Sequence, residues 1–394
     1  MISKRLQQVQ PSVTLAVTQK EKELKDQGIA VIGFGAGEPD FDAPEHVKEA
    51  VALSLEENST SKYTAAAGTP SLKRAIQVNI KAHYGLTYEP AQVVVGCGAK
   101  HVLYNIIQVI CDVGDEIIIP APYWVSYPEM VRLAGGTPVF VETNAEQNYV
   151  PSVEAIMAAV TPRTRAVIVN SPSNPTGALW PVQVMRDLLE ALKPHEQVMI
   201  ISDDIYDQLV YDGGKATNIA TLDPDWLERI FLVNGVSKSY AMTGWRIGWV
   251  AGPKPEMKAI ANLQSHSTSN PTTIAQIAAE AALMGPQQGV SEMRGAFEQR
   301  RNLMCAMFDK IPGITYVKPD GAFYVFADFS AYYGKREGIN DSLTMADYLL
   351  TEGHVAIVPG IAFGDDRCQR LSFACSEQRI EQGLAKIGVT LAKL

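Results

Sequence analysis

The amino-acid sequence predicts an α/β protein in which helices cover both faces of a mostly parallel sheet, together with a smaller α+β domain. Short apolar runs alternate with helical patterns between residues 93 and 234, as in the strand–helix–strand units of parallel sheets. After residue 285 the predicted elements are shorter and alternate less regularly. The length of 394 residues suits two or three domains at roughly 100–200 residues each.

The alternating part begins with a run of valines at 93–95, which favours a buried strand. Pro181 suits the first turn of a helix, because its fixed φ matches the helix and its missing N–H needs no partner there. The expected strands are 93–95, 116–119, 137–141, 165–169, 198–202 and 230–234, and the expected helices are 100–110, 124–133, 152–160 and 181–192.

The last hundred residues predict the smaller domain. The first forty or so residues do not join the alternating series, and we expect them to pack with this domain. The predicted boundaries are therefore 44–285 for the large domain, and 1–43 with 286–394 for the small one. The expected elements of the small domain are helices at 290–310, 343–352 and from 377 onward, and strands at 314–317, 323–328, 355–358 and 370–373.

Composition narrows the class of protein. Hydrophobic residues make up 46% and the net charge is −9, which argues against a nucleic-acid or anionic-membrane binder because either needs a basic face. No apolar run approaches the roughly 18 residues of a membrane helix, and the first residues lack the apolar core of a signal peptide. The 5 cysteines form no C-x-x-C pair and fit free thiols better than a zinc site. We therefore expect a cytoplasmic enzyme without a bound metal.

In parallel sheets, ligands bind beyond the carboxyl ends of the strands, so the loops after each strand are candidates. The glycine-rich turn 96–100 opens a helix and fits a phosphate site, although an ordinary strand–helix turn has the same pattern. Asn174 lies between two prolines, which hold its side chain rigidly. Asp203 follows a strand and is either a helix cap or, if a helical turn begins there, shares a face with Tyr206.

Lys238 follows the strand at 230–234, in a loop of small and aromatic residues. Burial in such a loop lowers the pKa of a lysine, and a neutral amine forms Schiff bases, although most lysines are solvated surface charges. The glycine cluster 33–37 is similar to a dinucleotide-binding loop. Pro39 follows at once and leaves no continuous helix to receive a pyrophosphate, which argues against an NAD-dependent dehydrogenase.

Taken together, several short segments in chain order resemble the fold-type I pyridoxal-phosphate aminotransferases, most closely the prokaryotic-type (subgroup Ib) aspartate aminotransferases. The resemblance covers nearly the whole chain. It implies a mostly parallel seven-stranded sheet in the large domain, pyridoxal 5′-phosphate as cofactor, and a homodimer with shared active sites. The segments are 35–41, 62–63 with Gly68, 123–128, 174–177, 203–206, 237–248 and 370–373.

The resemblance assigns cofactor chemistry to five side chains. Lys238 is the lysine that forms the Schiff base and then moves a proton as general base. Asp203 pairs with the pyridinium nitrogen and keeps the ring an electron sink. Tyr206 and Asn174 hydrogen-bond the phenolic oxygen, and Trp124 stacks on the ring.

The resemblance also implies a phosphate site. Arg246 clamps the phosphate, helped by the backbone N–H groups of Gly98 and Ala99. Ser237 is a further candidate ligand. Tyr63 reaches the phosphate of the neighbouring subunit, which is why a homodimer is implied.

Substrate binding is the last property that the resemblance implies. Arg370 holds the substrate α-carboxylate in a bidentate fork, opposite the Gly37 backbone. A dicarboxylic substrate needs a second cation, and no arginine lies in the stretch 265–270 that corresponds to the animal-type site. Lys100 and Thr14 match the lysine and threonine that bind the distal carboxylate in subgroup Ib.

These assignments predict an aspartate:2-oxoglutarate aminotransferase with ping-pong kinetics. Aromatic or prephenate transamination is the main alternative, with Arg5 as a candidate additional cation, and a β-lyase comes after it. Cys97 and His101 replace residues usual in close relatives, which leaves room for changed specificity. A non-catalytic regulator on the same fold is disfavoured, because no basic DNA-binding module precedes residue 30.

Overall fold

The computed structural model describes residues 2–3, 6–9 and 13–394, apart from the side chains of residues 13–16 and 18. Its largest element is a seven-stranded sheet with strand order β2-β8-β7-β6-β5-β3-β4. Strand β8 is antiparallel to both neighbours, and the other neighbouring strands are parallel. This sheet confirms the predicted fold class. Its strands are β2 (Val93–Gly96), β3 (Glu116–Ala121), β4 (Thr137–Glu142), β5 (Thr164–Asn170), β6 (Met199–Asp203), β7 (Ile230–Gly235) and β8 (Gly248–Ala251).

Strand β8 is the one member of the large sheet that sequence patterns did not predict. It has 4 residues, directly follows the loop that carries Lys238, and lies outside the six strands expected for this sheet. Pairing with β7 returns the chain along the sheet, with Gly235 opposite Gly248. The loop between them is thereby held at the carboxyl end of β7.

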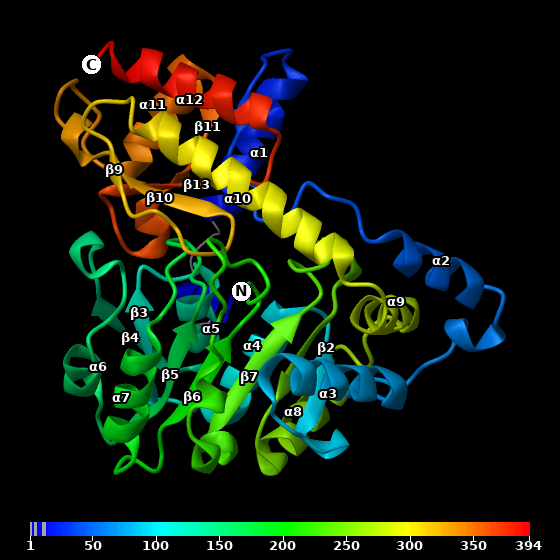
Figure 1. Cartoon of the computed structure of the whole chain (residues 1–394). Helices are drawn as coiled ribbons and strands as arrows, with labels where there is room; N and C mark the ends of the chain where they lie inside the picture. The colour runs from blue at the N-terminus through cyan, green and yellow to red at the C-terminus, as the bar shows by residue number, and fades with distance from the viewer. Residues whose placement is uncertain (1, 4–5, 10–12) are drawn as a thin grey trace.

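Helices bury both faces of this sheet (Figure 1). Side chains alternate along each strand, so Val94 packs toward α4 and α8 while Val93 and Val95 pack toward α3 and α9. Each fully buried valine or isoleucine contributes roughly 1.5–3 kcal/mol of transfer free energy. The helices are α2 (Glu45–Ser54), α3 (Pro70–Tyr84), α4 (Ala99–Ile110), α5 (Ser126–Ala134), α6 (Val153–Ala159), α7 (Val182–Leu192), α8 (Lys254–Ser267) and α9 (Thr273–Met284).

The C-terminal third forms a second layer above the large sheet in Figure 1. It contains an antiparallel sheet of order β12-β13-β10-β9 and a parallel pair of β1 with β11. The single strand expected at 355–358 is two strands, because the chain leaves β1 and joins β13 at Ile357. The elements are α1 (Val13–Asp26), β1 (Ile32–Gly33), α10 (Gln288–Phe308), β9 (Thr315–Tyr316), β10 (Tyr324–Asp328), α11 (Ser342–Gly353), β11 (Val355–Ala356), β12 (Val358–Pro359), β13 (Cys368–Ser372) and α12 (Glu377–Leu391).

Short 3-10 helices connect these elements. Helix α1 contacts β11 and β12, which places the N-terminal segment against the C-terminal third of the chain. No helix within the described residues is both long enough and apolar enough to cross a membrane. The 3-10 helices are Leu6–Gln8, Asn58–Ser61, Pro90–Gln92, Ala145–Gln147, Ile219–Thr221, Pro224–Arg229, Thr243–Trp245, Ser330–Tyr332 and Gly360–Phe363.

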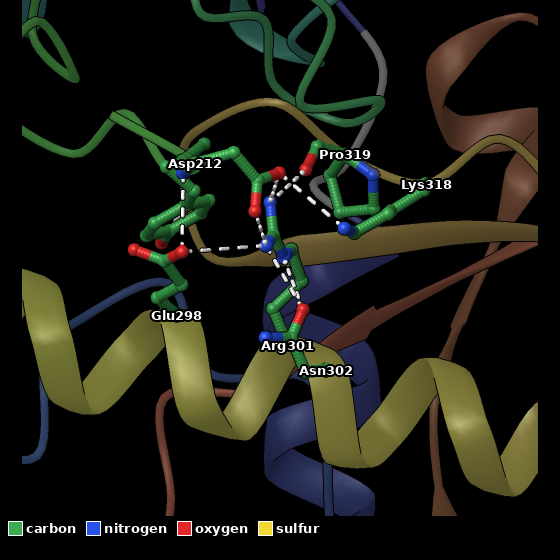
Figure 2. Close-up of polar contacts among 8 residues, drawn as sticks. Asp212, Glu298, Arg301, Asn302, Lys318 and Pro319 are labelled. Carbon is green, nitrogen blue, oxygen red and sulfur yellow. Dashed lines mark hydrogen bonds and ion pairs between the residues drawn. The ribbon is translucent and has the colours of Figure 1, made fainter. Parts of the chain in front are cut away.

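A buried arginine joins the two layers (Figure 2). Arg301 of α10 is fully buried and donates to both carboxylate oxygens of Asp212, at 2.9 and 2.8 Å. It also donates to the Pro319 carbonyl at 3.1 Å, and its guanidinium lies 4.8 Å from the centre of the Tyr211 ring. Lys318 contacts the same carboxylate at 3.3 Å. The contact therefore fixes α10 relative to the loop that follows β6.

Replacing Asp212 with asparagine is expected to destabilise the protein by about 1–2 kcal/mol, because the buried guanidinium of Arg301 loses its nearest counter-charge and keeps only Glu298, at 3.8 Å, among the described residues. Asparagine tolerates the positive φ of 55° at this position, so the backbone is not strained.

The contribution of Asp212 to stability depends on pH, because Arg301 lowers the pKa of Asp212 to about 2. The carboxylate therefore stabilises the fold above pH 4, and this contribution is lost as the pH falls toward 2. Because the Asp212 side chain is 56% exposed, solvent screening reduces the contribution of this ion pair to the free energy of unfolding.

Urea unfolding at pH 7 and pH 3 measures this prediction. The difference between the variant and the wild type should be smaller at pH 3. An equal difference at both pH values would show that the charge of Asp212 is not what stabilises α10.

Candidate active site

A cavity of about 840 Å³ lies at the carboxyl end of the central strands. Loops after β5, β6 and β7 meet there with the segment 33–38, the start of α4, and residues of β10 and β13. Most of the predicted site residues line this cavity: Gly37, Ala99, Lys100, Trp124, Asn174, Asp203, Tyr206, Ser237, Lys238, Arg246 and Arg370.

Of the remaining predicted residues, the structure places Gly98 outside the cavity lining and leaves the roles of Tyr63, Thr14 and Arg5 untested. Gly98 does not line the cavity; it caps α4 with a φ of 90°, and its N–H donates to the Gly96 carbonyl at 2.8 Å. Tyr63 is 91% exposed, and its predicted partner belongs to a neighbouring subunit. Thr14 lies in α1, but its side chain is outside the described residues, as is the whole of Arg5.

Lys238 is a buried amine in the cavity lining. Its ammonium group donates to the Gly37 carbonyl across the cavity. Burial lowers the pKa of Lys238 to about 8; Glu38 opposes this shift and Arg246 adds to it. A lysine with such a pKa is partly neutral near pH 7, and only the neutral amine attacks a carbonyl carbon.

Asp203 supplies a buried carboxylate at the end of β6. The Tyr127 hydroxyl donates to it at 2.7 Å and the Ile205 N–H at 3.3 Å. Burial raises the pKa of Asp203 to about 6, while these two hydrogen bonds and the charge of Lys238 oppose the rise. The carboxylate is therefore mostly ionised at pH 7. Asp203 and Tyr206 do not share a helix, because a turn follows β6, yet both line the cavity.

Arg370 of β13 is a buried cation, 3% exposed. It donates to the Asn174 side-chain oxygen at 3.1 Å and to the Gly35 carbonyl at 3.0 Å. Within the described residues, no carboxylate pairs with this guanidinium and its Nε has no hydrogen-bond partner. A buried cation without a counter-charge is costly unless an anion binds, so Arg370 marks a place for a ligand carboxylate.

The glycine-rich segment 33–37 holds this end of the cavity together. Its carbonyls accept from Arg370 and from Lys238, and no helix begins between this segment and α2, which starts at Glu45. The segment is therefore a ligand-facing strap and does not have the helix that a dinucleotide-binding loop requires.

An anion cradle lies at the N-terminus of α4. Arg246, in the left-handed conformation with φ 57°, donates to the carbonyls of Thr243 at 2.8 Å and Cys97 at 3.4 Å. A Cβ atom at Gly98 would lie 2.6 Å from the Arg246 guanidinium, so only glycine fits there. No side chain caps α4, and uncapped N–H groups with the helix dipole favour a phosphate.

Lys100 and Trp124 form the far wall of the cavity. The Lys100 ammonium lies 4.9 Å from the centre of the Trp124 ring. Burial lowers the pKa of Lys100, and the charge of Arg246 adds to this shift. The Trp124 ring packs edge-to-face on Tyr127, with centroids 5.3 Å apart. The second cation predicted for a dicarboxylic ligand thus lines the same cavity as Arg370.

Sequence reasoning missed two tyrosines of this site. Tyr127, the donor to Asp203, belongs to the quoted segment 123–128 but was given no role. Tyr324 lies in the strand expected at 323–328, to which no site residue was assigned, and its hydroxyl is 2.9 Å from that of Tyr206. Their residue type gave no signal, because a buried tyrosine in a strand or helix is usually a packing residue.

Comparison with known proteins decides the family. The model of the family "aminotransferase class I and II" matches residues 29–387. The chain belongs to this family. The aminotransferase is 49% identical to the aspartate aminotransferase of Geobacillus stearothermophilus over 389 residues, 98% of each chain. It is 47% identical to the aspartate/prephenate aminotransferase of Cereibacter sphaeroides over 397 residues, covering 100% of this chain and 99% of the relative.

A solved structure agrees with these relatives. The crystal structure of the aspartate aminotransferase from Rhizobium meliloti superposes on this aminotransferase with a TM-score of 0.96 at 41% identity, covering 100% of this chain and 99% of that one. The predicted family, the fold class and the cofactor, pyridoxal 5′-phosphate, are therefore confirmed.

The residues present fit this cofactor. A lysine with a lowered pKa, a buried carboxylate and an anion cradle line one cavity. Each group suits one part of pyridoxal 5′-phosphate. The lysine suits the aldehyde, the carboxylate suits the pyridine nitrogen, and the anion cradle suits the phosphate. The bound cofactor supplies an electron sink for breaking bonds at the α-carbon of an amino acid.

Proposed function

We propose that this aminotransferase transfers the amino group of L-aspartate to 2-oxoglutarate by a ping-pong mechanism, giving oxaloacetate and L-glutamate. The observation that carries the proposal is a pair of cations for two carboxylates in one cavity: Arg370 without a counter-charge, and Lys100 against Trp124. The relatives named aspartate aminotransferase support the same substrate.

Five side chains would hold the ring of the cofactor. Lys238 binds its aldehyde carbon, and Asp203 supplies the negative charge that keeps the ring nitrogen protonated. Tyr206 and Asn174 donate to the phenolic oxygen, and Trp124 packs on the ring. The support for these roles is that all five line the cavity and that Asp203 is ionised at pH 7.

The phosphate would lie between Arg246 and the start of α4. Ala99 and Ser237 line the cavity beside this arginine, and Gly98 allows its close approach. Tyr63 would reach the phosphate of a neighbouring subunit in a homodimer. Its 91% exposure in the single chain is unusual for a large aromatic side chain and supports a surface that a second copy covers.

Arg370 would bind the α-carboxylate of the substrate, with Gly37 opposite it, and Lys100 with Thr14 would bind the distal carboxylate. The Lys238 amine, freed when the substrate amine takes its place, would act as the general base that removes the α-proton and holds it at Nζ. We further infer that residues 1–43 and 286–394 form a small domain that closes on residues 44–285, which excludes water and protects the proton transfer.

We also place the enzyme in the cytoplasm in this proposal. All five cysteines are free thiols, which a reducing compartment preserves. Four of them (Cys111, Cys305, Cys368 and Cys375) are buried, and burial raises their pKa values, so they are poorly reactive.

Titration of the cofactor-loaded protein with amino acids, without added oxo acid, tests the substrate. L-aspartate is expected to convert the visible absorbance to that of the aminated cofactor at lower concentration than L-phenylalanine. Prephenate remains a second candidate, because a relative of 47% identity is named aspartate/prephenate aminotransferase. Conversion by phenylalanine as well as by aspartate would move the assignment to an aromatic or prephenate enzyme. Absence of a visible cofactor band would contradict the role of Lys238.

Replacing Lys100 with alanine is expected to lower kcat/KM for aspartate by roughly 10-fold, because one charged hydrogen bond to the distal carboxylate, worth about 1.5–3 kcal/mol, is lost. Phenylalanine has no such carboxylate, so its kcat/KM should change by less than about threefold. Steady-state kinetics with both amino donors measures the difference, with Lys254→Ala as a surface control, since Lys254 pairs only with Glu89. Equal losses with both donors would remove Lys100 from the specificity site.

A further inference from the structure

Tyr324 contacts a side chain on the proposed cofactor side of the cavity and another on the proposed substrate side. It is 1% exposed and lines the cavity from β10. Its hydroxyl lies 2.9 Å from the hydroxyl of Tyr206. Its ring lies 4.3 Å from the Arg370 guanidinium.

The strand register explains this position. Phe326 of β10 is opposite Arg370 of β13, and Tyr324 is opposite Ser372. Residues two apart in a strand point to the same face, so Tyr324 and Arg370 are diagonal neighbours on the face that lines the cavity. Diagonal neighbours lie within reach of aromatic and long side chains. The Tyr324 ring therefore packs beside the guanidinium as a consequence of the pairing.

The hydroxyl pair constrains where protons lie. Burial raises the pKa values of Tyr206 and Tyr324, so both hydroxyls are neutral. Each has one proton, and only one of the two can donate within the pair. If Tyr206 donates to the phenolic oxygen of the cofactor, then Tyr324 must donate to Tyr206. No other hydrogen bond to the Tyr206 hydroxyl is present among the described residues.

The ring constrains the guanidinium. The guanidinium of Arg370 lies over the Tyr324 ring, at 4.3 Å, and over the Phe363 ring, at 4.9 Å. A planar guanidinium packed on two aromatic rings has less freedom to rotate than one in solvent. The plane in which it offers its two N–H groups to a carboxylate is therefore fixed before the substrate arrives.

We propose that Tyr324 is a positioning residue with two separable parts: its hydroxyl directs the proton of Tyr206 toward the cofactor, and its ring sets the plane of Arg370 for the substrate carboxylate. The inference rests on the proposed function. It adds a residue that acts through Tyr206 and Arg370 and does not itself react.

Two variants separate the parts. Tyr324→Phe removes the hydroxyl and keeps the ring. In the cofactor-loaded protein, the pH midpoint of the visible band should move upward by about half a unit, because a weaker hydrogen bond from Tyr206 stabilises the anionic oxygen less. Binding of maleate, a non-reactive dicarboxylate, measured by calorimetry, should change by less than about twofold. Tyr324→Leu also removes the ring, and maleate binding should weaken by roughly 10-fold.

The matched control is Tyr348→Phe, which removes a buried hydroxyl that donates to the Thr390 carbonyl at 3.1 Å, away from the cavity. It should leave the pH midpoint and maleate binding unchanged.

An unmoved pH midpoint in Tyr324→Phe would overturn the role of the hydroxyl. Unchanged maleate binding in Tyr324→Leu would overturn the role of the ring. If the wild-type protein forms no visible band with the cofactor, the proposed function fails first, so the two failures are distinguishable. Thermal unfolding of each variant without cofactor checks that the fold is intact.

Discussion

Replacing Lys238 with alanine is expected to abolish covalent attachment of the cofactor and to lower turnover by roughly 10⁴-fold. The lysine would act twice, as the amine that binds the aldehyde and as the base that moves the α-proton. Positioned acid–base groups alone contribute about 10²–10⁴-fold. Lys238→Arg retains the positive charge without the nucleophile and should be as inactive as the alanine variant. Mass of the borohydride-reduced protein and single-turnover kinetics with aspartate measure the two effects. A residual rate within tenfold of the wild type would show that another group is the base.

The lowered pKa of Lys238 gives this prediction a pH dependence. A pKa of about 8 in place of about 10.5 increases the neutral fraction at pH 7 by roughly 300-fold. The rate at which the cofactor-free protein takes up pyridoxal 5′-phosphate should therefore rise with pH up to about 8 and then level off. A rate that still rises tenfold per pH unit between 9 and 10 would mean that Lys238 is solvated.

Sequence patterns predicted those parts of the fold that have a strong local signal. Valine-rich runs such as 93–95 predicted strands because they are buried on both faces. Strand β8 was missed because its 4 residues, Gly-Trp-Val-Ala, include a single β-branched residue, whereas β2, of the same length, has three. The split between β11 and β12 depends on which strands lie beside them, and residues 355–358 carry no information on those partners.

The candidate site divides in a similar way. Residues with reactive or charged groups in loops after strands, such as Lys238 and Asp203, were predictable because parallel strands bring their carboxyl ends together. Tyr127 and Tyr324 were not, because each acts through a hydrogen bond to a residue 76 or 118 positions away. The ion pair between Asp212 and Arg301 spans 89 positions. Such contacts between residues far apart in the chain follow from tertiary packing, and they cannot be predicted from a single sequence.

Replacing Arg370 with lysine is expected to lower kcat/KM by roughly 100-fold for aspartate and phenylalanine alike. Lysine retains the charge, but it loses the planar fork that matches a carboxylate and the packing on the Tyr324 and Phe363 rings. One charge-assisted hydrogen bond with its orientation is worth about 2–3 kcal/mol, and each 1.4 kcal/mol is tenfold. The neighbouring Arg367, whose side chain is 52% exposed and pairs with Asp365, provides the matched control, and Arg367→Lys should have little effect on either donor.

The comparison of the two donors makes the Arg370 result decisive. Both amino acids carry an α-carboxylate, so a loss at the site that binds it must be shared between them. A loss at Lys100 must fall on aspartate alone, because only aspartate has the distal carboxylate. If Arg370→Lys impaired aspartate and spared phenylalanine, the two cations would have exchanged roles, and the substrate would lie in the cavity with its carboxylates reversed. The buried guanidinium without a counter-charge would then be the distal site, and Lys100, 4.9 Å from the Trp124 ring, the α-carboxylate site.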